Sequence, residues 1–86
     1  MPRISSFYGI VILMFYDDHN PPHFHVQYAE FKALIAIQDF RVIRGNLPPK
    51  ALALVIEWAA LRQTELMKDW ELMKLDKPLL PIEPLQ

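Results

Sequence analysis

Residues 21–28 read PPHFHVQY, and the alternation within this stretch indicates how the first half of the chain folds. The apolar side chains at positions 24, 26 and 28 fall on one face of an extended chain, and the polar side chains at positions 23, 25 and 27 fall on the other. We therefore expect a strand whose apolar face enters the core. The same strand then points His23 and His25 outward or into a cleft.

Working outward, residues 9–16 (GIVILMFY) are rich in β-branched and aromatic types and are apolar on both alternating faces, which predicts a central strand covered on both sides. The segment Asp17–Pro22 breaks this run, because Asn before Pro favours a turn or an extended backbone. Two further short apolar runs follow the alternating strand. The sequence thus predicts an antiparallel meander within residues 7–44, with about four strands at 9–16, 23–28, 31–37 and 40–44.

The second half of the chain is typical of a helix. Residues 45–49 (GNLPP) signal a helix start, with an asparagine available as a cap and prolines tolerated in the first turn. Because no Gly or Pro interrupts residues 50–74, we expect one long helix within residues 46–75. A Pro-rich tail, residues 76–86, follows it, and its leucines cap the core or dock on a neighbouring subunit. The predicted fold class is α+β, a single domain (1–86) with a small antiparallel sheet packed against one long C-terminal helix.

This helix carries two apolar faces. A broad one can pack on the sheet, and a second, narrower stripe consists of Leu54, Trp58, Leu61 and Leu72. A long helix with two apolar faces usually contacts two things, so the second stripe predicts a protein partner or a homo-oligomer such as a dimer. Trp58 is the expected anchor of this interface, since Trp is enriched at the energetic centres of interfaces.

Composition restricts the classes of function. A chain of 86 residues makes one domain, and 52% apolar residues with only two glycines exclude a disordered chain. With no Cys, a structural disulfide or a thiolate zinc site is excluded. No run reaches the ~20 apolar residues of a membrane span, so we expect a cytoplasmic protein without a membrane partner. Nine Lys and Arg against ten Asp and Glu give a net charge of −1, which does not support a general nucleic-acid binder but leaves a local patch open.

All three histidines of the chain lie within residues 17–25, beside two carboxylates. His23 and His25 can place two imidazoles on one strand face, and a residue of the preceding turn can complete a three-ligand site for a divalent metal. The candidate metal ligands are His23, His25, Asp18 and His19. In the simpler alternative, the two imidazoles form hydrogen bonds across the sheet and no cofactor binds.

Acid–base chemistry is a further alternative for the same histidines. An imidazole near neutrality, together with Arg3, Arg41 or Arg44 on a neighbouring strand, can hold a phosphodiester and protonate its leaving group. Because Arg41 and Arg44 alternate onto opposite faces, at most one of them should join His23 and His25. The chain contains no Gly-rich phosphate loop and no nucleophile-elbow motif.

Several short motifs occur along the chain, each of them once, and the Pro-Pro-His-Phe-His segment is the most specific of them. The set is Met1–Ser5, Phe7–Ile12, Asp18–His25, Gly45–Pro48, Ala51–Leu54, Glu57–Ala59 and Asp69–Glu71. Through these motifs the chain resembles the bacterial domain-of-unknown-function family 4160 over nearly its whole length. The resemblance implies no established activity. It implies that the protein is one half of a compact two-gene module, in an arrangement similar to a toxin–antitoxin pair. The chain departs from the family at Ala29 and Ala36, and this departure argues against chemistry at those two positions.

Two functions from different classes follow. The favoured one is a small bacterial protein–protein interaction module without catalytic activity, a component of a toxin–antitoxin-like pair. The alternative is a metal- or histidine-dependent enzyme that acts on RNA or another phosphoester through His23 and His25. Convergence of the histidines with an aspartate in the structure would favour the second.

Overall fold

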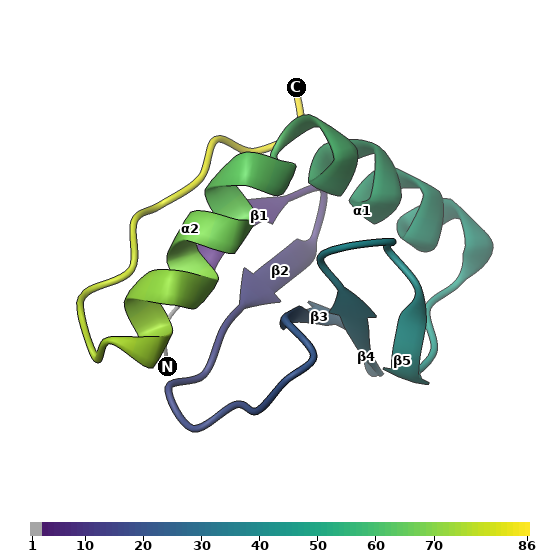
Figure 1. Ribbon diagram of the computed structural model, residues 1–86. Helices are drawn as coiled ribbons and strands as arrows, with labels where there is room; N and C mark the ends of the chain where they lie inside the picture. Colours follow the sequence, from purple (N-terminus) through teal and green to yellow (C-terminus); the bar gives the residue numbers. More distant parts are fainter. Residues whose placement is uncertain (1–2) are drawn as a thin grey trace.

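The computed structural model describes residues 3–86, so that Met1 and Pro2, which begin the expected domain and its first motif, lie outside the described part. The chain forms an α+β domain in which five antiparallel strands pair in sequence order and two helices follow them (Figure 1). The strands are β1 (Arg3–Phe7), β2 (Ile10–Leu13), β3 (His23–Tyr28), β4 (Phe31–Ala36) and β5 (Val42–Gly45), and the helices are α1 (Pro49–Leu61) and α2 (Gln63–Lys74). The predicted fold class is confirmed, and its details differ by one strand and one helix break.

The additional strand is β1, which forms a hairpin with β2. Phe7 pairs with Ile10, and both intervening residues have positive φ, +50° at Tyr8 and +79° at Gly9. Two central residues with positive φ are what a tight two-residue hairpin turn needs, because this backbone twist matches the twist of the flanking strands. The expected single strand from Gly9 is therefore the second arm of a hairpin.

The alternation of β3 is confirmed. Phe24 and Val26 are buried in the core, and Phe24 pairs with Ile35 of β4 while Val26 pairs with Ala33. Ala29 adopts a φ of +52°, so the two-residue link to β4 forms without the Gly that such turns favour.

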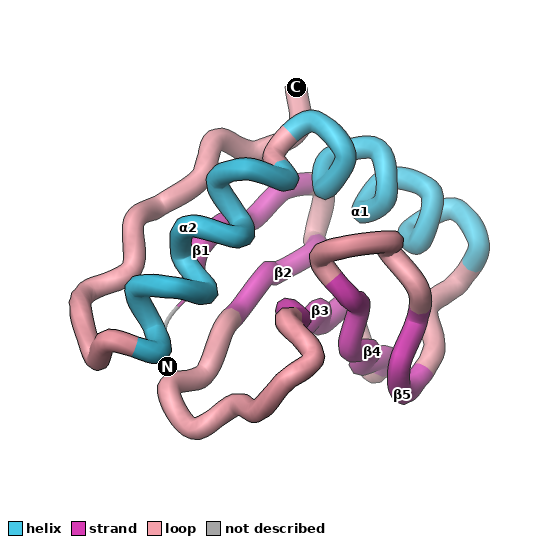
Figure 2. Tube along the Cα trace, viewed as in Figure 1, coloured by secondary structure: helices cyan, strands magenta, loops and turns pink. Residues whose placement is uncertain are grey.

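The expected long helix is divided at Arg62, whose φ of −119° and ψ of 20° leave the helical region. Figure 2 shows that α1 and α2 run in different directions over the sheet. The Gln63 side chain, at the start of α2, donates hydrogen bonds to the carbonyl oxygens of Ile37 (2.8 Å) and Gln38 (3.0 Å) after β4. Tertiary contacts therefore hold the break, and no Gly or Pro marks it in the sequence.

The structure corrects the position of Trp58. The expected contact stripe of Leu54, Trp58, Leu61 and Leu72 requires an exposed indole, but Trp58 is 0% exposed. Its ring packs against Phe7 (centroids 5.4 Å apart) and Phe24 (6.0 Å) in the middle of the core. Leu61 is exposed and the other two leucines are half-buried, so the stripe is not continuous.

The C-terminal tail, residues 76–86, returns beside α2 to the β1 side of the molecule (Figure 1). The Ile82 amide donates a hydrogen bond to the Ile4 carbonyl (2.8 Å), and the Ile82 side chain is buried. The carboxylate of Asp69 accepts the Leu80 amide (2.9 Å). The tail thus closes the core, as its apolar residues predict. Within residues 3–86, neither helix is long and apolar enough to cross a bilayer.

Candidate functional site

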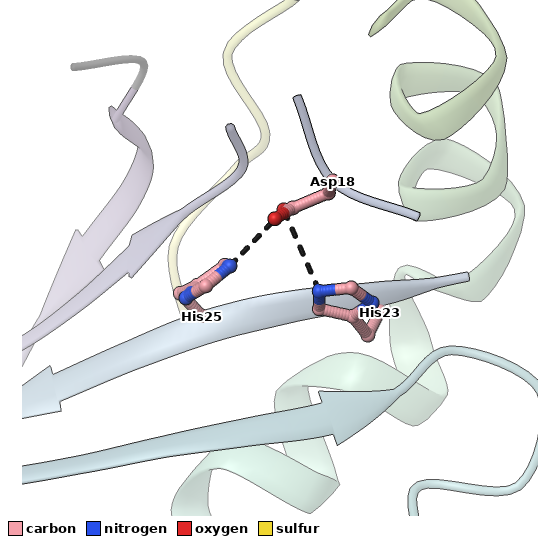
Figure 3. A group of neighbouring side chains, drawn as sticks. All are labelled: Asp18, His23 and His25. Atoms are coloured by element: carbon pink, nitrogen blue, oxygen red, sulfur yellow. Dashed lines mark hydrogen bonds and ion pairs between the residues drawn. The ribbon is translucent and has the colours of Figure 1, made fainter. Parts of the chain in front are cut away.

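Three side chains with metal-ligating atoms converge where β3 begins (Figure 3). One ligating atom from each of Asp18, His23 and His25 lies within 4.8 Å of the other two. The Nε2 atom of His25 is 3.0 Å from Oδ2 of Asp18, and the Nε2 atom of His23 is 3.5 Å from the same oxygen. Of the four ligands expected from the sequence, the structure brings three together, and His19 is exposed outside this group.

Asp18 reaches the two histidines because the loop between β2 and β3 folds back on itself. The Asp18 amide donates a hydrogen bond to the Phe15 carbonyl (3.2 Å), and the Phe15 amide donates one to Oδ2 of Asp18 (3.2 Å). At the other end of the loop, the Pro22 carbonyl accepts the Ile37 amide (3.0 Å) after β4. Both ends of the loop are therefore tied down, and the carboxylate has a defined place above β3.

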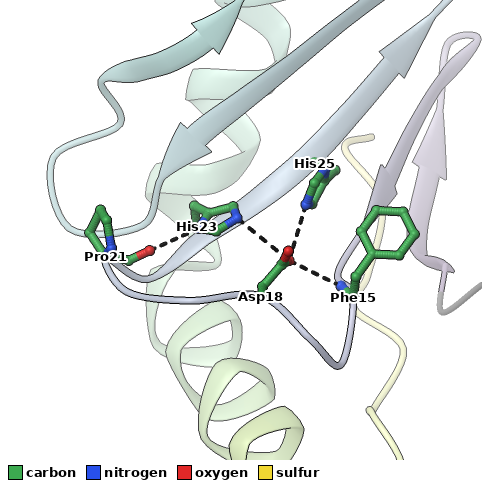
Figure 4. A network of polar contacts seen from close by, with 5 residues as sticks. All are labelled: Phe15, Asp18, Pro21, His23 and His25. Atoms are coloured by element: carbon green, nitrogen blue, oxygen red, sulfur yellow. Dashed lines mark hydrogen bonds and ion pairs between the residues drawn. The ribbon is translucent and has the colours of Figure 1, made fainter.

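The orientation of the His23 ring follows from its second nitrogen. Nδ1 lies 2.8 Å from the Pro21 carbonyl oxygen (Figure 4), and because a carbonyl only accepts hydrogen bonds, Nδ1 carries the hydrogen. In the neutral ring, Nε2 then presents a lone pair toward Asp18. Histidines that bind metals almost always hold their other N–H on a carbonyl or carboxylate in this way, which sets both tautomer and ring direction.

Oδ2 of Asp18 is the point where these groups meet, since it faces both Nε2 atoms and the Phe15 amide. The 3.0 Å contact from His25 is a hydrogen bond in which Nε2–H donates, because a carboxylate oxygen only accepts. Nε2 of His23 faces the same oxygen at 3.5 Å, with its own hydrogen on Nδ1. The three side chains are thus held close together, and a cation could replace the hydrogen between them.

Aromatic rings form the walls of the site. The Phe15 ring meets the His25 ring edge-on (4.4 Å between centroids, 89° between planes), and Trp70 of α2 lies 5.3 Å from the His23 ring. Side-chain exposure rises from 8% at His23 through 14% at Asp18 to 22% at His25. The site is therefore enclosed on the Trp70 side and opens to solvent beside His25.

The spacing of the three ligating atoms suits a tetrahedral metal ion. Two ligands bound about 2.1 Å from such an ion lie about 3.4 Å apart, close to the separations that Asp18 makes with the two histidines. Three protein ligands leave one coordination position for water or substrate, which is the composition of catalytic rather than structural zinc sites. Without a metal, the Asp18–His25 pair is a carboxylate-oriented base.

A separate hollow of about 570 Å³ lies on the solvent side of α2. It is lined by Gln63, Thr64, Met67, Lys68 and Glu71. It shares no residue with the histidine site. The histidines mark the candidate site, because convergent polar groups rather than volume define a chemical site.

The fold and this site together define a small α+β protein with a two-histidine, one-carboxylate centre. Residues 9–71 match the model of the family described as domain of unknown function DUF4160, and the chain belongs to this family. The matched part includes all three residues of the centre. No curated protein and no solved structure matches the chain.

Sequence reasoning named Asp18 and missed one further part of the site. No pattern in the sequence explains why Asp18 rather than the exposed Asp17 joins the histidines, because the choice depends on the turn that ties Asp18 to Phe15. Sequence reasoning placed Trp70 in the core, which is confirmed, but no signal in the sequence indicates that this ring also flanks His23.

Proposed function

We propose that the protein binds a divalent transition-metal ion through Asp18, His23 and His25 and uses the remaining coordination position to hydrolyse a phosphoester. The convergence of both Nε2 atoms on one carboxylate oxygen, with the His23 ring held by the Pro21 carbonyl, is the observation that carries this proposal. It supports the histidine-dependent enzyme over the interaction module.

The ligand chemistry selects the metal class. Two imidazoles and one carboxylate suit zinc, nickel or similar ions, whereas Mg²⁺ and Ca²⁺ prefer oxygen ligands throughout. Asp18, His23 and His25 would hold the metal, which would activate water and neutralise charge on a phosphoryl oxygen. Hydrolysis would join the oxygen of a water molecule to phosphorus and break the bond from phosphorus to the leaving oxygen, and the proton lost by the water would pass to the leaving oxygen.

The three residues have separable tasks in this scheme. His23 is the buried ligand, fixed by its hydrogen bond to the Pro21 carbonyl. Asp18 supplies the negative charge that balances the cation. His25 lies at the open side, so the substrate reaches the coordination position past its ring. His23→Ala should therefore disturb folding more than His25→Ala.

Isothermal titration of metal-free protein with zinc tests the proposal. Wild type and the His19→Ala control should bind one equivalent, and His25→Ala should weaken binding by at least about tenfold through the loss of one of three ligands. Hydrolysis of bis(para-nitrophenyl) phosphate should follow metal occupancy. Identical titration curves for wild type and the His23→Ala/His25→Ala double variant would remove the metal site.

A second candidate is the interaction module, with a protein partner or a second copy of the chain, as in a toxin–antitoxin-like pair. The surface that supports it is smaller than the expected stripe of four residues. Leu61 is 66% exposed and borders a hollow of about 210 Å³, which is lined by α1 and the tail residues Pro84–Gln86. Leu61→Ser should lower the mass measured by light scattering if this surface joins two copies. A monomeric wild type would remove self-association.

A further inference from the structure

The charged side chains of the strands are all cationic, whereas the helices and the tail carry charges of both signs. Within residues 3–86, the five strands contain three cationic side chains and no Asp or Glu. The carboxylates of the first half lie in the turns, and six of the ten in the chain lie after the strands, in the helices and tail. Although the net charge of the chain is −1, all charged side chains within the five strands are therefore cationic.

All three cations, Arg3, Lys32 and Arg44, project from one face of the sheet. We call it the outer face, and it lies opposite the core face of the sheet, which carries Phe24 and Val26. Arg3 pairs with Leu13, Lys32 with Gln27, and Arg44 with Leu34, so the three cations share the face from which His25 projects. All three cationic residues are exposed.

The pairing register also aligns five of these positions across the sheet. We call this line the histidine row; it crosses β1 to β5 in the order Arg3, Leu13, His25, Leu34 and Arg44. With neighbouring strands about 4.8 Å apart, the row is roughly 19 Å long, and each arginine is two strands from His25. The open side of the metal site is thus the midpoint between two arginines.

We propose that the outer face binds single-stranded nucleic acid along the histidine row, with one phosphate at the Asp18–His23–His25 centre and the neighbouring phosphates on Arg3 and Arg44. This inference rests on the proposed phosphoesterase function and names its substrate class. Arginine pairs with phosphate through a planar fork of donors, and arginines placed on both sides of a centre hold a chain running through it.

The geometry favours a flexible single strand over other anions. The row lies across a sheet, where an extended chain can follow it, and the half-buried Leu34 provides apolar surface between His25 and Arg44, whereas Leu13 is buried. The Phe15 ring, which is partly exposed, stands against His25, so that a base beside the centre has an aromatic ring on which to stack. Small phosphate esters would engage one arginine at most.

Binding of a fluorescein-labelled oligouridylate, measured by anisotropy at low salt on the zinc-loaded full chain, tests the inference. Arg44→Gln should weaken binding by about tenfold and lower the slope of affinity against salt by about one. Arg41→Gln is the matched control, because Arg41 is also exposed and the substitution removes the same charge, but Arg41 lies outside the row. Arg41→Gln should change affinity less than about twofold.

Equal losses of oligouridylate affinity in Arg44→Gln and Arg41→Gln would contradict binding along the histidine row. Binding of poly-glutamate of matched length as tightly as oligouridylate would contradict it too. Zinc titrations separate this inference from the proposed function. Arg44→Gln, which changes no residue of the metal site, should bind zinc as wild type does while its oligouridylate affinity falls. If wild type binds zinc but not oligouridylate, the proposed substrate class is wrong and the metal site stands. If it binds oligouridylate but not zinc, the metal site is wrong and nucleic-acid binding stands.

Discussion

The indole N–H of Trp58 donates a 2.7 Å hydrogen bond to the carbonyl oxygen of Glu83, which ties the centre of the core to the tail. Trp58 is fully buried at one end of this contact. The stability of the sheet–helix interface and the position of the last residues are therefore coupled through one side chain.

Removal of this ring should be severe. Trp58→Ala should lower the free energy of unfolding by about 3–5 kcal/mol, because it leaves a large cavity against Phe7 and Phe24. Trp58→Phe keeps most of the ring volume and loses the Glu83 hydrogen bond, so its cost should be smaller. Urea denaturation followed by circular dichroism measures both. A Trp58→Ala variant as stable as wild type would contradict the core assignment.

Asp69 gives the protein a pH-dependent stability. Burial raises the pKa of this carboxyl above its ordinary value of 3.8; the Leu80 amide lowers the pKa in part, and the charge of Glu65 raises it. Oδ2 of Asp69 is buried with no hydrogen-bond partner. A raised pKa in the folded state means that the protonated form stabilises the fold. This stabilisation is complete below the unfolded-state pKa and is lost as pH rises through the folded-state pKa.

The variant Asp69→Asn should therefore be more stable than wild type at neutral pH, and the advantage should shrink in acid. The amide oxygen can still accept the Leu80 N–H, so the tail contact is retained. Melting temperatures from about pH 4 to pH 8 measure the difference. Glu71→Gln, on an exposed side chain of the same helix, serves as the control. Parallel curves for wild type and Asp69→Asn would exclude the effect.

The two glycines form a matched pair. Both have positive φ, +79° at Gly9 and +80° at Gly45, so alanine at either position costs roughly 1–2 kcal/mol in backbone conformation. At Gly9 the new Cβ would meet only the Tyr28 ring at 3.7 Å, whereas at Gly45 it would lie 2.1 Å from the Lys32 carbonyl oxygen. Gly45→Ala should consequently melt well below Gly9→Ala in a thermal scan. Equal melting temperatures would show that β5 can shift away from β4.

Metal should stabilise the fold if the proposed site binds it. Ligand at about 100 times its dissociation constant adds about 2.7 kcal/mol to the free energy of unfolding, because it binds only the folded state. Zinc should raise the melting temperature of wild type and His19→Ala, a chelator should reverse the rise, and His25→Ala should show none of it. A zinc-induced rise in the His25→Ala variant would place the metal elsewhere.

Much of the fold follows from local patterns. The alternation of β3 predicts which face Phe24 and Val26 bury, and the run from Lys50 predicts helix. The break at Arg62 could not be predicted, because hydrogen bonds from Gln63 to backbone far away in sequence hold it. Trp58 was misplaced for a related reason: the helix rotation that buries it depends on Phe7 in β1, a strand that the pattern did not indicate.

The site was predictable in its residue types and not in its geometry. Period-two spacing places both imidazoles on one face of β3, as the structure shows. Which carboxylate joins them depends on the four-residue turn from Phe15 to Asp18, and the tautomer of His23 depends on the Pro21 carbonyl. Neither of these leaves a periodic signal.

The hydrogen bond between Ile82 and Ile4 bears on the tendency of the protein to aggregate at high concentration. β1 is an edge strand of the sheet, and an uncovered edge can recruit strands from other chains into aggregates. The tail lies beside β1 and occupies the Ile4 carbonyl. The opposite edge, β5, is four residues long and carries an exposed arginine, features that discourage such pairing. Removal of the last residues would thus uncover the edge of β1, and truncated chains should aggregate under conditions in which they are still folded.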